Sequence, residues 1–233
     1  MVRMRIASAS WIVLLVIVLA PCVVQATKSL LGDKEKKKVE QRSVEKLDFP
    51  ARGKIYINKS FGEVRVEGWD QAAVELTVTK AIKASDTPEK QAEAAAKLKR
   101  VRVTIVKDQS DSLVIHSEVP FRSNLELKYE IKVPRQSTLF IKHDIGDVEV
   151  SNIVGDVNVN ARIGDVRVRL PASEEFNVDA RAKIGDVSSE FGGKNSRQWL
   201  IGAKANQATD YKATAYWVIA RIGIGDIQVE KMK

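Results

Sequence analysis

Residues 145–166 read IGDVEVSNIVGDVNVNARIGDV, so an aliphatic residue, Gly, Asp and Val follow one another three times within this stretch. Two further copies lie downstream, and the glycines of the five copies lie 9, 9, 21 and 40 residues apart. The five pairs are Gly146-Asp147, Gly155-Asp156, Gly164-Asp165, Gly185-Asp186 and Gly225-Asp226. A motif that returns at related spacings indicates one small structural unit stacked on itself.

Apolar residues alternate with polar ones after the Gly-Asp pairs, as in Val148-Glu149-Val150 and Val166-Arg167-Val168. Side chains of a strand point to opposite faces in turn, so each run predicts a half-buried strand. Glycine tolerates a positive φ and aspartate hydrogen-bonds its own turn backbone, so each Gly-Asp pair predicts a corner. A coil of about 18 to 21 residues would hold two short strands and two turns, and successive coils would pair in parallel about 4.8 Å apart.

This coil predicts where individual side chains lie. Val148, Val166 and Val187 should share one sheet, and Val157 and Val178 should lie in the facing sheet. The residues between the buried positions are chemically unrelated and should face solvent; they are Glu149, Asn158, Arg167 and Gln228. The predicted fold class is all-β, a parallel, β-helix-like β-solenoid preceded by a β region that carries one short helix.

The N-terminal half already alternates, over residues 54–57, 63–67 and 74–78. Gly62, in Phe61-Gly62-Glu63-Val64, predicts an early corner because this stretch is a variant of the later repeat. A helix is predicted over residues 88–99, since a proline suits its first position and strong helix formers follow. Its thin apolar stripe should lie on the surface of the sheet and consists of Ala92, Ala95, Ala96 and Leu98.

The first 26 residues are typical of a secretory signal peptide. Arg3 and Arg5 precede an apolar run over residues 11–20, and Val24-Gln25-Ala26 offers small residues for cleavage before Thr27. The alternative is an N-terminal anchor that is retained, with residues 6–24 in contact with a membrane. Cys22 is the only cysteine, and its surroundings are similar to a lipobox except that Pro21 stands where a small residue is expected.

The predicted organisation follows from these patterns. Residues 1–26 form the signal peptide or anchor, residues 27–47 a charged linker, and residues 48–233 the β-strand-repeat domain. That domain divides into an N-terminal β part, 48–143, and the Gly-Asp-Val solenoid, 144–233. A chain that begins at Thr27 has no thiol, and therefore neither a disulfide nor a thiolate metal site.

Catalytic motifs are missing from the sequence. His116 and His143 lack the i, i+4 partner of a metalloprotease helix, no G-x-S-x-G elbow occurs, and no Gly-rich phosphate loop opens a helix. We therefore predict no cofactor and no catalytic or metal-binding residue. A polysaccharide-modifying enzyme on a β-helix is the alternative, because carboxylates of neighbouring coils could form a catalytic pair.

Two features allow a second interpretation. Asp147, Asp156 and Asp165 return every nine residues, as in calcium-binding β-rolls, but each turn offers one carboxylate whereas calcium takes six to eight oxygens. Turn capping is therefore favoured over calcium binding. Trp217 could cap the open end of the core or stack against a sugar, and the first interpretation is favoured.

The stretch Ser60-Phe61-Gly62-Glu63-Val64-Arg65-Val66-Glu67-Gly68-Trp69-Asp70, the strand at residues 129–134 and the Gly-Asp-Val repeats resemble one known family. This is the putative adhesin family of bacterial β-strand-repeat proteins, a domain family of unknown function. The resemblance covers residues 54–229 and implies an exported bacterial β-solenoid with no established catalytic residues. "Adhesin" is here a label by analogy, because a fold does not imply a function.

We therefore expect an extracytoplasmic, non-enzymatic protein of the periplasm, cell envelope or exterior, an adhesin-like binding or scaffolding protein with a polar sheet surface. Its partner would be an envelope protein, a glycan or a surface, and not a nucleic acid. Besides the polysaccharide-modifying enzyme, the other alternative is a periplasmic sensing or regulatory module held at the membrane.

Overall fold

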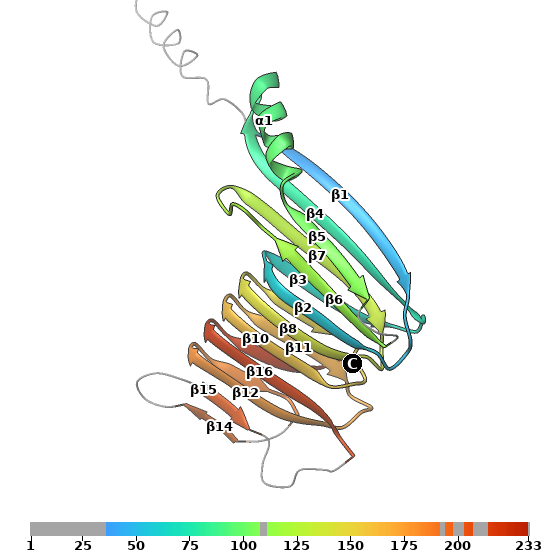
Figure 1. The fold of residues 1–233 in the computed structure, drawn as a ribbon. Coiled ribbons are helices and arrows are strands. Elements are labelled where there is room, and N and C mark those ends of the chain that lie inside the picture. The colour runs from blue at the N-terminus through green and yellow to red at the C-terminus, as the bar shows by residue number, and fades with distance from the viewer. Residues whose placement is uncertain (1–35, 108–110, 192–193, 198–202, 207–213, 233) are drawn as a thin grey trace, which may run out of the picture. The chain divides into compact units, whose positions relative to one another are not determined.

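The computed structural model describes residues 36–107, 111–191, 194–197, 203–206 and 214–232. The predicted signal peptide and the first part of the predicted linker, residues 27–35, lie outside these ranges. From Lys36 onward the chain forms one compact unit. Its described part holds seventeen strands in two sheets and the helix α1 (Pro88–Leu98), so the predicted all-β solenoid is confirmed (Figure 1).

Each sheet combines a parallel centre with antiparallel strands outside it. Sheet A contains, in spatial order, β1 (Lys36–Asp48), β4 (Ala73–Ser85), β7 (Leu125–Pro134), β3 (Glu63–Trp69), β9 (Val148–Ser151), β11 (Val166–Pro171), β17 (Ile227–Met232) and β13 (Val187–Ser189). Sheet B contains β14 (Lys194–Arg197), β15 (Ala203–Asn206), β12 (Phe176–Ile184), β16 (Tyr216–Ile224), β10 (Val157–Ile163), β8 (Thr138–Ile145), β2 (Lys54–Phe61), β6 (Ser112–Glu118) and β5 (Arg102–Lys107).

The parallel strands form six stacked coils, each with one strand in either sheet. In space the coils follow the order β6–β7, β2–β3, β8–β9, β10–β11, β16–β17 and β12–β13. This differs from the order along the chain at both ends of the stack. The first coil in the sequence, β2–β3, and the last, β16–β17, each lie one place in from an end, and Figure 1 shows β16 between β10 and β12.

Two inward rows of side chains form the centre of the core. The row in sheet A consists of Tyr129, Val64, Val148, Val166, Ile227 and Val187. The row in sheet B consists of Leu113, Ile55, Leu139, Val157, Val218 and Val178. All are buried, and the predicted positions of the five valines are confirmed. Burying each such side chain stabilises the fold by about 1.5–3 kcal/mol.

The predicted linker is shorter than expected, because residues 36–47 belong to β1. This strand pairs with β4 in antiparallel register from Lys36 to Asp48. Its sequence does not alternate because β1 is an edge strand with both faces largely in solvent, and only Val39 and Leu47 pack partly against the core. Backbone pairing therefore defines this strand, and the hydrophobic pattern does not show it.

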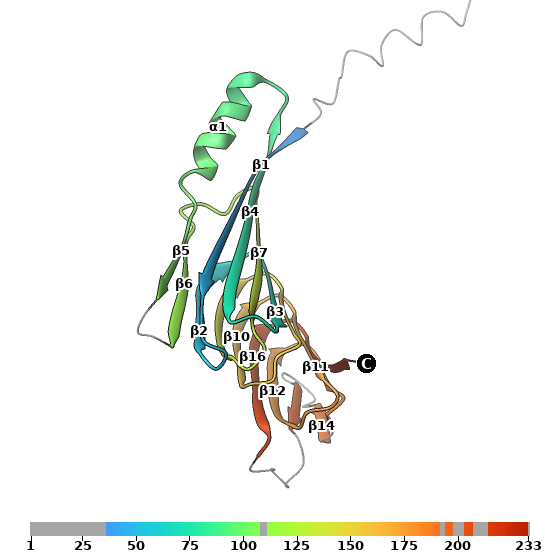
Figure 2. The same ribbon diagram turned by 90° about the vertical axis from the view of Figure 1, so that its right-hand side faces the viewer.

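The helix α1 forms where it was expected and packs against β4 and β1 (Figure 2). Its buried residues are Ala94 and Leu98, whereas Ala92 and Ala96 are exposed, so the predicted stripe was right at Leu98 and wrong at Ala92 and Ala96. It links the antiparallel strands at the end of sheet A to β5 of sheet B. No helix among the described residues has the length and apolarity needed to cross a membrane.

A few polar side chains lie in the core near the β6–β7 end of the stack. The Ser60 hydroxyl and His143 Nδ1 are 2.7 Å apart, and both residues are buried. Burial lowers the pKa of His143, since the charged imidazolium would lose its hydration. Tyr129 donates to the Ser117 hydroxyl at 2.8 Å, and burial raises the pKa of Tyr129 to about 12.

Candidate functional site

Within a coil, the corner from sheet B to sheet A carries a glycine in five of the six coils, followed by Asp in four of them and by Glu63 in the fifth. Its glycines stack in the order Gly62, Gly146, Gly164, Gly225 and Gly185, with φ values of 97°, 122°, 133°, 134° and 133°. A Cβ at Gly164 would overlap the carbonyl oxygen of Gly146 in the neighbouring coil. Glycine is thus required here both by the left-handed backbone and by the close approach of the next coil.

Beside the glycines, the aspartates connect successive coils by hydrogen bonds. Asp147 Oδ1 accepts the backbone N–H of Asp165 at 3.0 Å, and Asp165 Oδ1 accepts that of Asp226 at 3.0 Å. Asp226 Oδ1 accepts the backbone N–H of Asp186 at 2.8 Å. Each of these three carboxylates thus caps the corner of the following coil, and Glu63 occupies the equivalent position after Gly62.

The pair Gly155-Asp156 belongs to the opposite corner, between β9 and β10. Gly155 is not among the residues with positive φ, so the left-handed conformation expected for it is absent. Its small size is still needed, because a Cβ would overlap the carbonyl oxygen of Ser137. Asp156 Oδ1 accepts the backbone N–H of Trp217 at 2.8 Å and so also joins two coils.

The stacked corner aspartates Asp147, Asp165, Asp226 and Asp186 are called the Asp column. The outer face of sheet A carries two rows of polar side chains next to it. One row runs through Arg65, Glu149, Arg167 and Gln228, and the next through Glu67, Ser151, Arg169 and Glu230. We call these eight residues and Glu63 the polar face. Three positions that the sequence predicted to face solvent, Glu149, Arg167 and Gln228, are direct neighbours in one row, whereas Asn158 lies on sheet B.

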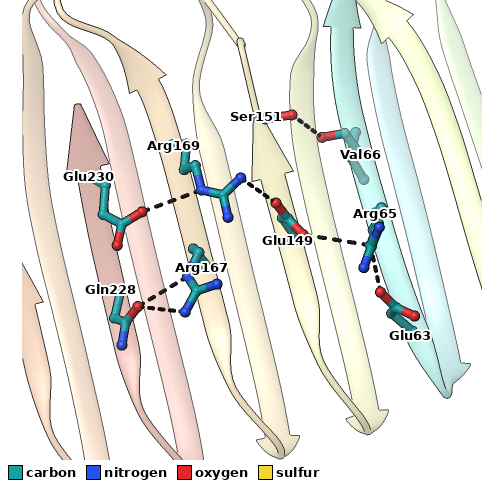
Figure 3. A network of polar contacts seen from close by, with 9 residues as sticks. All are labelled: Glu63, Arg65, Val66, Glu149, Ser151, Arg167, Arg169, Gln228 and Glu230. Atoms are coloured by element: carbon teal, nitrogen blue, oxygen red, sulfur yellow. Dashed lines mark hydrogen bonds and ion pairs between the residues drawn. The ribbon is translucent and has the colours of Figure 1, made fainter. Parts of the chain in front are cut away.

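Opposite charges on the polar face are joined across the strands (Figure 3). Arg169 lies between Glu149, at 2.7 Å, and Glu230, at 3.3 Å. Arg65 contacts Glu63 at 2.5 Å and Glu149 at 3.6 Å. Arg167 donates to the Gln228 side-chain oxygen at 3.0 Å and 2.9 Å. The pairs are partly exposed, so each contributes at most about 1 kcal/mol to stability.

The alternation of charge continues toward β7. Lys128 contacts Glu130 at 3.0 Å, and the hydrogen bond from the Lys128 ammonium lowers the pKa of the Glu130 carboxyl. Between the Asp column and the polar face lies a shallow depression of about 200 Å³, lined among others by Arg65, Asp165 and Arg167. Its donors and acceptors alternate at the spacing of the coils, which suits a polar partner that is bound by many weak contacts.

The remaining candidate residues do not join this site. His143 is buried in the core, and His116 lies on β6 of sheet B, whereas the polar face belongs to sheet A. Trp217 lies on the outer side of β16, inside sheet B, so the interpretation that it caps the end of the core was wrong; its exposed fraction is 37%. Among the residues that the structure describes, no three His, Cys, Asp or Glu side chains are grouped so as to hold a metal ion.

Sequence reasoning missed the pairing on the polar face. Arg169 and Glu230 are 61 residues apart in the chain, and they meet because β17 is inserted beside β11. Aligning the repeats on their glycines places Glu149, Arg167 and Gln228 in one row, which is the signal that was available. The order of the strands within that row has no counterpart in the local sequence.

Comparison with known proteins agrees with the fold. A family model described as Toastrack DUF4097 matches residues 32–216, more than half of the chain. A putative cell adhesion protein from Clostridium sporogenes has a similar structure, with a TM-score of 0.50 and 13% identity over 84% of this chain and 100% of that one.

Two other solved structures are less similar. A putative adhesin from Bacteroides fragilis has a TM-score of 0.30 and 11% identity, over 81% of this chain and 97% of that one. A putative lipid binding protein from Parabacteroides distasonis has a TM-score of 0.25 and 8% identity, over 83% and 97%. No protein with a curated description matches the sequence. The resemblance inferred from the repeats is confirmed at the level of family and fold.

Proposed function

We propose that this chain, which belongs to the Toastrack DUF4097 family of unknown function, is an exported, non-enzymatic binding or scaffolding protein of the bacterial cell envelope. In this proposal the polar face of sheet A is the surface presented to a partner, which is an envelope protein, a glycan or another surface component. The polar face is the observation that carries the proposal. Its side chains project in rows from a rigid parallel sheet, with exposed fractions such as 51% for Arg65 and 28% for Glu149.

Two further observations support an envelope location. Residues 1–26 have the charge, apolar run and small residues of a signal peptide. The Clostridium sporogenes protein of similar fold is described as a putative cell adhesion protein. That description applies to the Clostridium sporogenes protein itself. If residues 1–26 are not cleaved, they would instead hold the domain at a membrane as a sensing or regulatory module.

The pairing of the carboxylates favours binding over catalysis. Glycoside-cleaving enzymes need two carboxyl groups that are free to exchange protons or attack the substrate. Glu149 contacts two arginines, and Asp147 and Asp165 each accept a backbone N–H. Side chains held in this way are suited to recognition through fixed hydrogen bonds.

Co-sedimentation with purified bacterial cell-wall sacculi and envelope membranes tests this proposal. We expect the chain from Thr27 to sediment with one of the two preparations. The double variant Arg65→Glu, Arg169→Glu should bind at least tenfold more weakly, because it reverses charge at the centre of the polar face. The double variant Arg102→Glu, Lys107→Glu on the exposed strand β5 is the charge-matched control and should bind like the wild type.

Two outcomes would contradict the proposal. One is that the wild type binds neither preparation. The other is that the control loses as much affinity as the double variant, which would indicate attraction by net charge alone. N-terminal sequencing of the protein purified from envelopes separates the two forms of the proposal, since a start at Thr27 supports a released domain and an intact N-terminus supports an anchored one.

A further inference from the structure

A row of apolar side chains follows the outside of the Gly-Asp corner. The residue before each glycine takes part, and the strand register places these residues side by side in the order Phe61, Ile145, Ile163, Ile224 and Ile184. The last three are exposed by 38%, 49% and 55%. We call Ile163, Ile224 and Ile184 the Ile ridge. Single exposed isoleucines are ordinary, but three in register on adjacent strands form a continuous apolar edge.

The two flanks of the Ile ridge differ in charge. On the side of sheet A lie the aspartates of the corner, among them Asp165 and Asp186. On the side of sheet B lie Arg162 and Lys183, each directly before an isoleucine of the ridge. Both basic side chains belong to exposed residues, and no carboxylate of the described chain pairs with either of them. The ridge therefore separates an acidic flank from a basic one.

We propose that the Ile ridge is the contact surface for a second copy of this chain, with the two-fold axis running along the ridge. Rotation about such an axis places the ridge of one copy on the ridge of the other and exchanges the two flanks. Asp165 of one copy then faces Arg162 of the other, and Asp186 faces Lys183. The symmetry creates each of these contacts twice, and an isologous interface of this kind is the commonest form of association.

The other end of the row explains why the contact is confined to three coils. The Arg122 guanidinium lies 5.3 Å from the centre of the Phe61 ring and contacts Asp144 at 3.1 Å. In the neighbouring β8–β9 coil, Asp144 precedes Ile145 as Arg162 precedes Ile163, so two copies would there bring Asp147 opposite Asp144. The apolar residues are most exposed where the flanking charges are complementary.

The size and charge of the ridge decide between possible occupants. A stable interface buries about 800 Å² per partner, and a ridge one residue wide offers less, so the dimer is weak in dilute solution. It becomes relevant when copies are crowded on one surface, because their effective concentration is then high. A lipid surface fits less well, since the row of aspartates would face its anionic headgroups.

Disulfide cross-linking tests the geometry directly. The chain from Thr27 contains no cysteine, so Ile224→Cys introduces a single thiol. The two-fold axis brings residue 224 of both copies together, and mild oxidation should therefore form the disulfide-linked dimer at least tenfold faster than for Val44→Cys. Val44 is the matched control, since it is an exposed aliphatic residue on β1, at 59% exposure.

Sedimentation equilibrium measures the association without cross-linking. The wild type should show a reversible monomer–dimer equilibrium that Arg162→Glu weakens at least tenfold. Lys142→Glu is the matched control, because it carries the same charge change on the outer face of neighbouring β8 and should leave the equilibrium unchanged.

A protein that stays monomeric at millimolar concentration, with equal cross-linking of the two cysteine variants, overturns the proposal. So does binding to vesicles of phosphatidylcholine and phosphatidylglycerol that is lost in Ile224→Ser while the protein remains monomeric. That result would assign the ridge to lipid. Neither result bears on the polar face, which lies on the outer side of sheet A.

Discussion

The two corners of the coil differ in how much variation they accept. The Gly-Asp corner has nearly the same sequence in five coils, and its backbone is left-handed in all of them. The opposite corner has no common sequence, and the chain leaves the stack on that side for its insertions, namely β4, α1 and β5 after β3, and the β14–β15 hairpin after β13. A corner in which neighbouring coils touch through a left-handed backbone in five coils therefore fixes the sequence, whereas the opposite corner, where Gly155 makes a close contact without a positive φ, allows insertions.

Gly164→Val should have the largest effect on stability. Valine is strained at a φ of 133° and its Cβ would overlap the Gly146 carbonyl, so we expect a loss of about 3 kcal/mol or more. Gly155→Val, at the opposite corner, suffers the overlap without the backbone strain and should lose about 2 kcal/mol. Urea unfolding of the chain from Thr27 measures both values. Arg167→Ala is the control and should stay within about 0.5 kcal/mol of the wild type; a similar value for Gly164→Val would show that the corner is not strained.

Asp165→Ala should have the next largest effect. It removes the acceptor for the Asp226 backbone N–H, which costs about 1 kcal/mol for one lost capping hydrogen bond. Asp165→Asn should lose less, because the amide oxygen can still accept. Thermal or urea unfolding of both variants decides between a cap and a carboxylate needed for its charge. Equal losses for Ala and Asn would favour the second.

A pH effect smaller than these should arise from His143, which lies beneath the Gly-Asp corner. Burial lowers the pKa of the folded imidazole, whereas the unfolded one takes up a proton near pH 6.5. The unfolded state therefore binds more protons as the pH falls below 6.5, and stability decreases until the lower pKa of the folded state is passed. Unfolding curves between pH 8 and pH 5 measure this trend. His143→Gln should reduce the slope of the unfolding free energy against pH. An unchanged slope would assign the effect to other groups.

Calcium should have no effect on stability. The Asp column is engaged with backbone N–H groups, so millimolar calcium should leave the melting temperature of the chain from Thr27 unchanged. Binding to the folded state at 100 times the dissociation constant would add about 2.7 kcal/mol. A rise of several degrees in calcium that disappears in Asp165→Asn would assign a metal-binding role to this corner.

The repeats predicted what lies within a coil, but not which coils are neighbours. The pattern around Val148 and Val166 gave the correct faces and sheets because the two-residue period of a strand is local. The interval of 40 residues between Gly185 and Gly225 is about twice the length of a coil. It actually contains the β14–β15 hairpin and the return of the chain into the stack. Every coil offers neighbours the same apolar rows, so the order must depend on the ends of the chain and on the insertions.

The candidate site was predictable only in part. The corner residues followed from glycine and aspartate chemistry, and the outward position of Arg167 followed from alternation. The contacts of Arg169 with Glu149 and Glu230 depend on strand order, and the strand β1 depends on backbone pairing at an edge. Neither leaves a periodic hydrophobic signal, so neither could be read from the sequence.

The insertion of the first and last coils changes how the stack can come apart. In a simple solenoid the terminal repeat can fray as a free tail, which gains a large conformational entropy. Here the outermost coils, β6–β7 and β12–β13, lie in the middle of the chain, and both of their ends remain attached to coils inside the stack. A frayed outer coil therefore stays a closed loop and gains less entropy than a tail would. The parallel stack should accordingly resist stepwise unravelling, because the coil nearest each chain terminus is held between two neighbours, and an exoprotease acting from the N-terminus would first meet the edge strand β1.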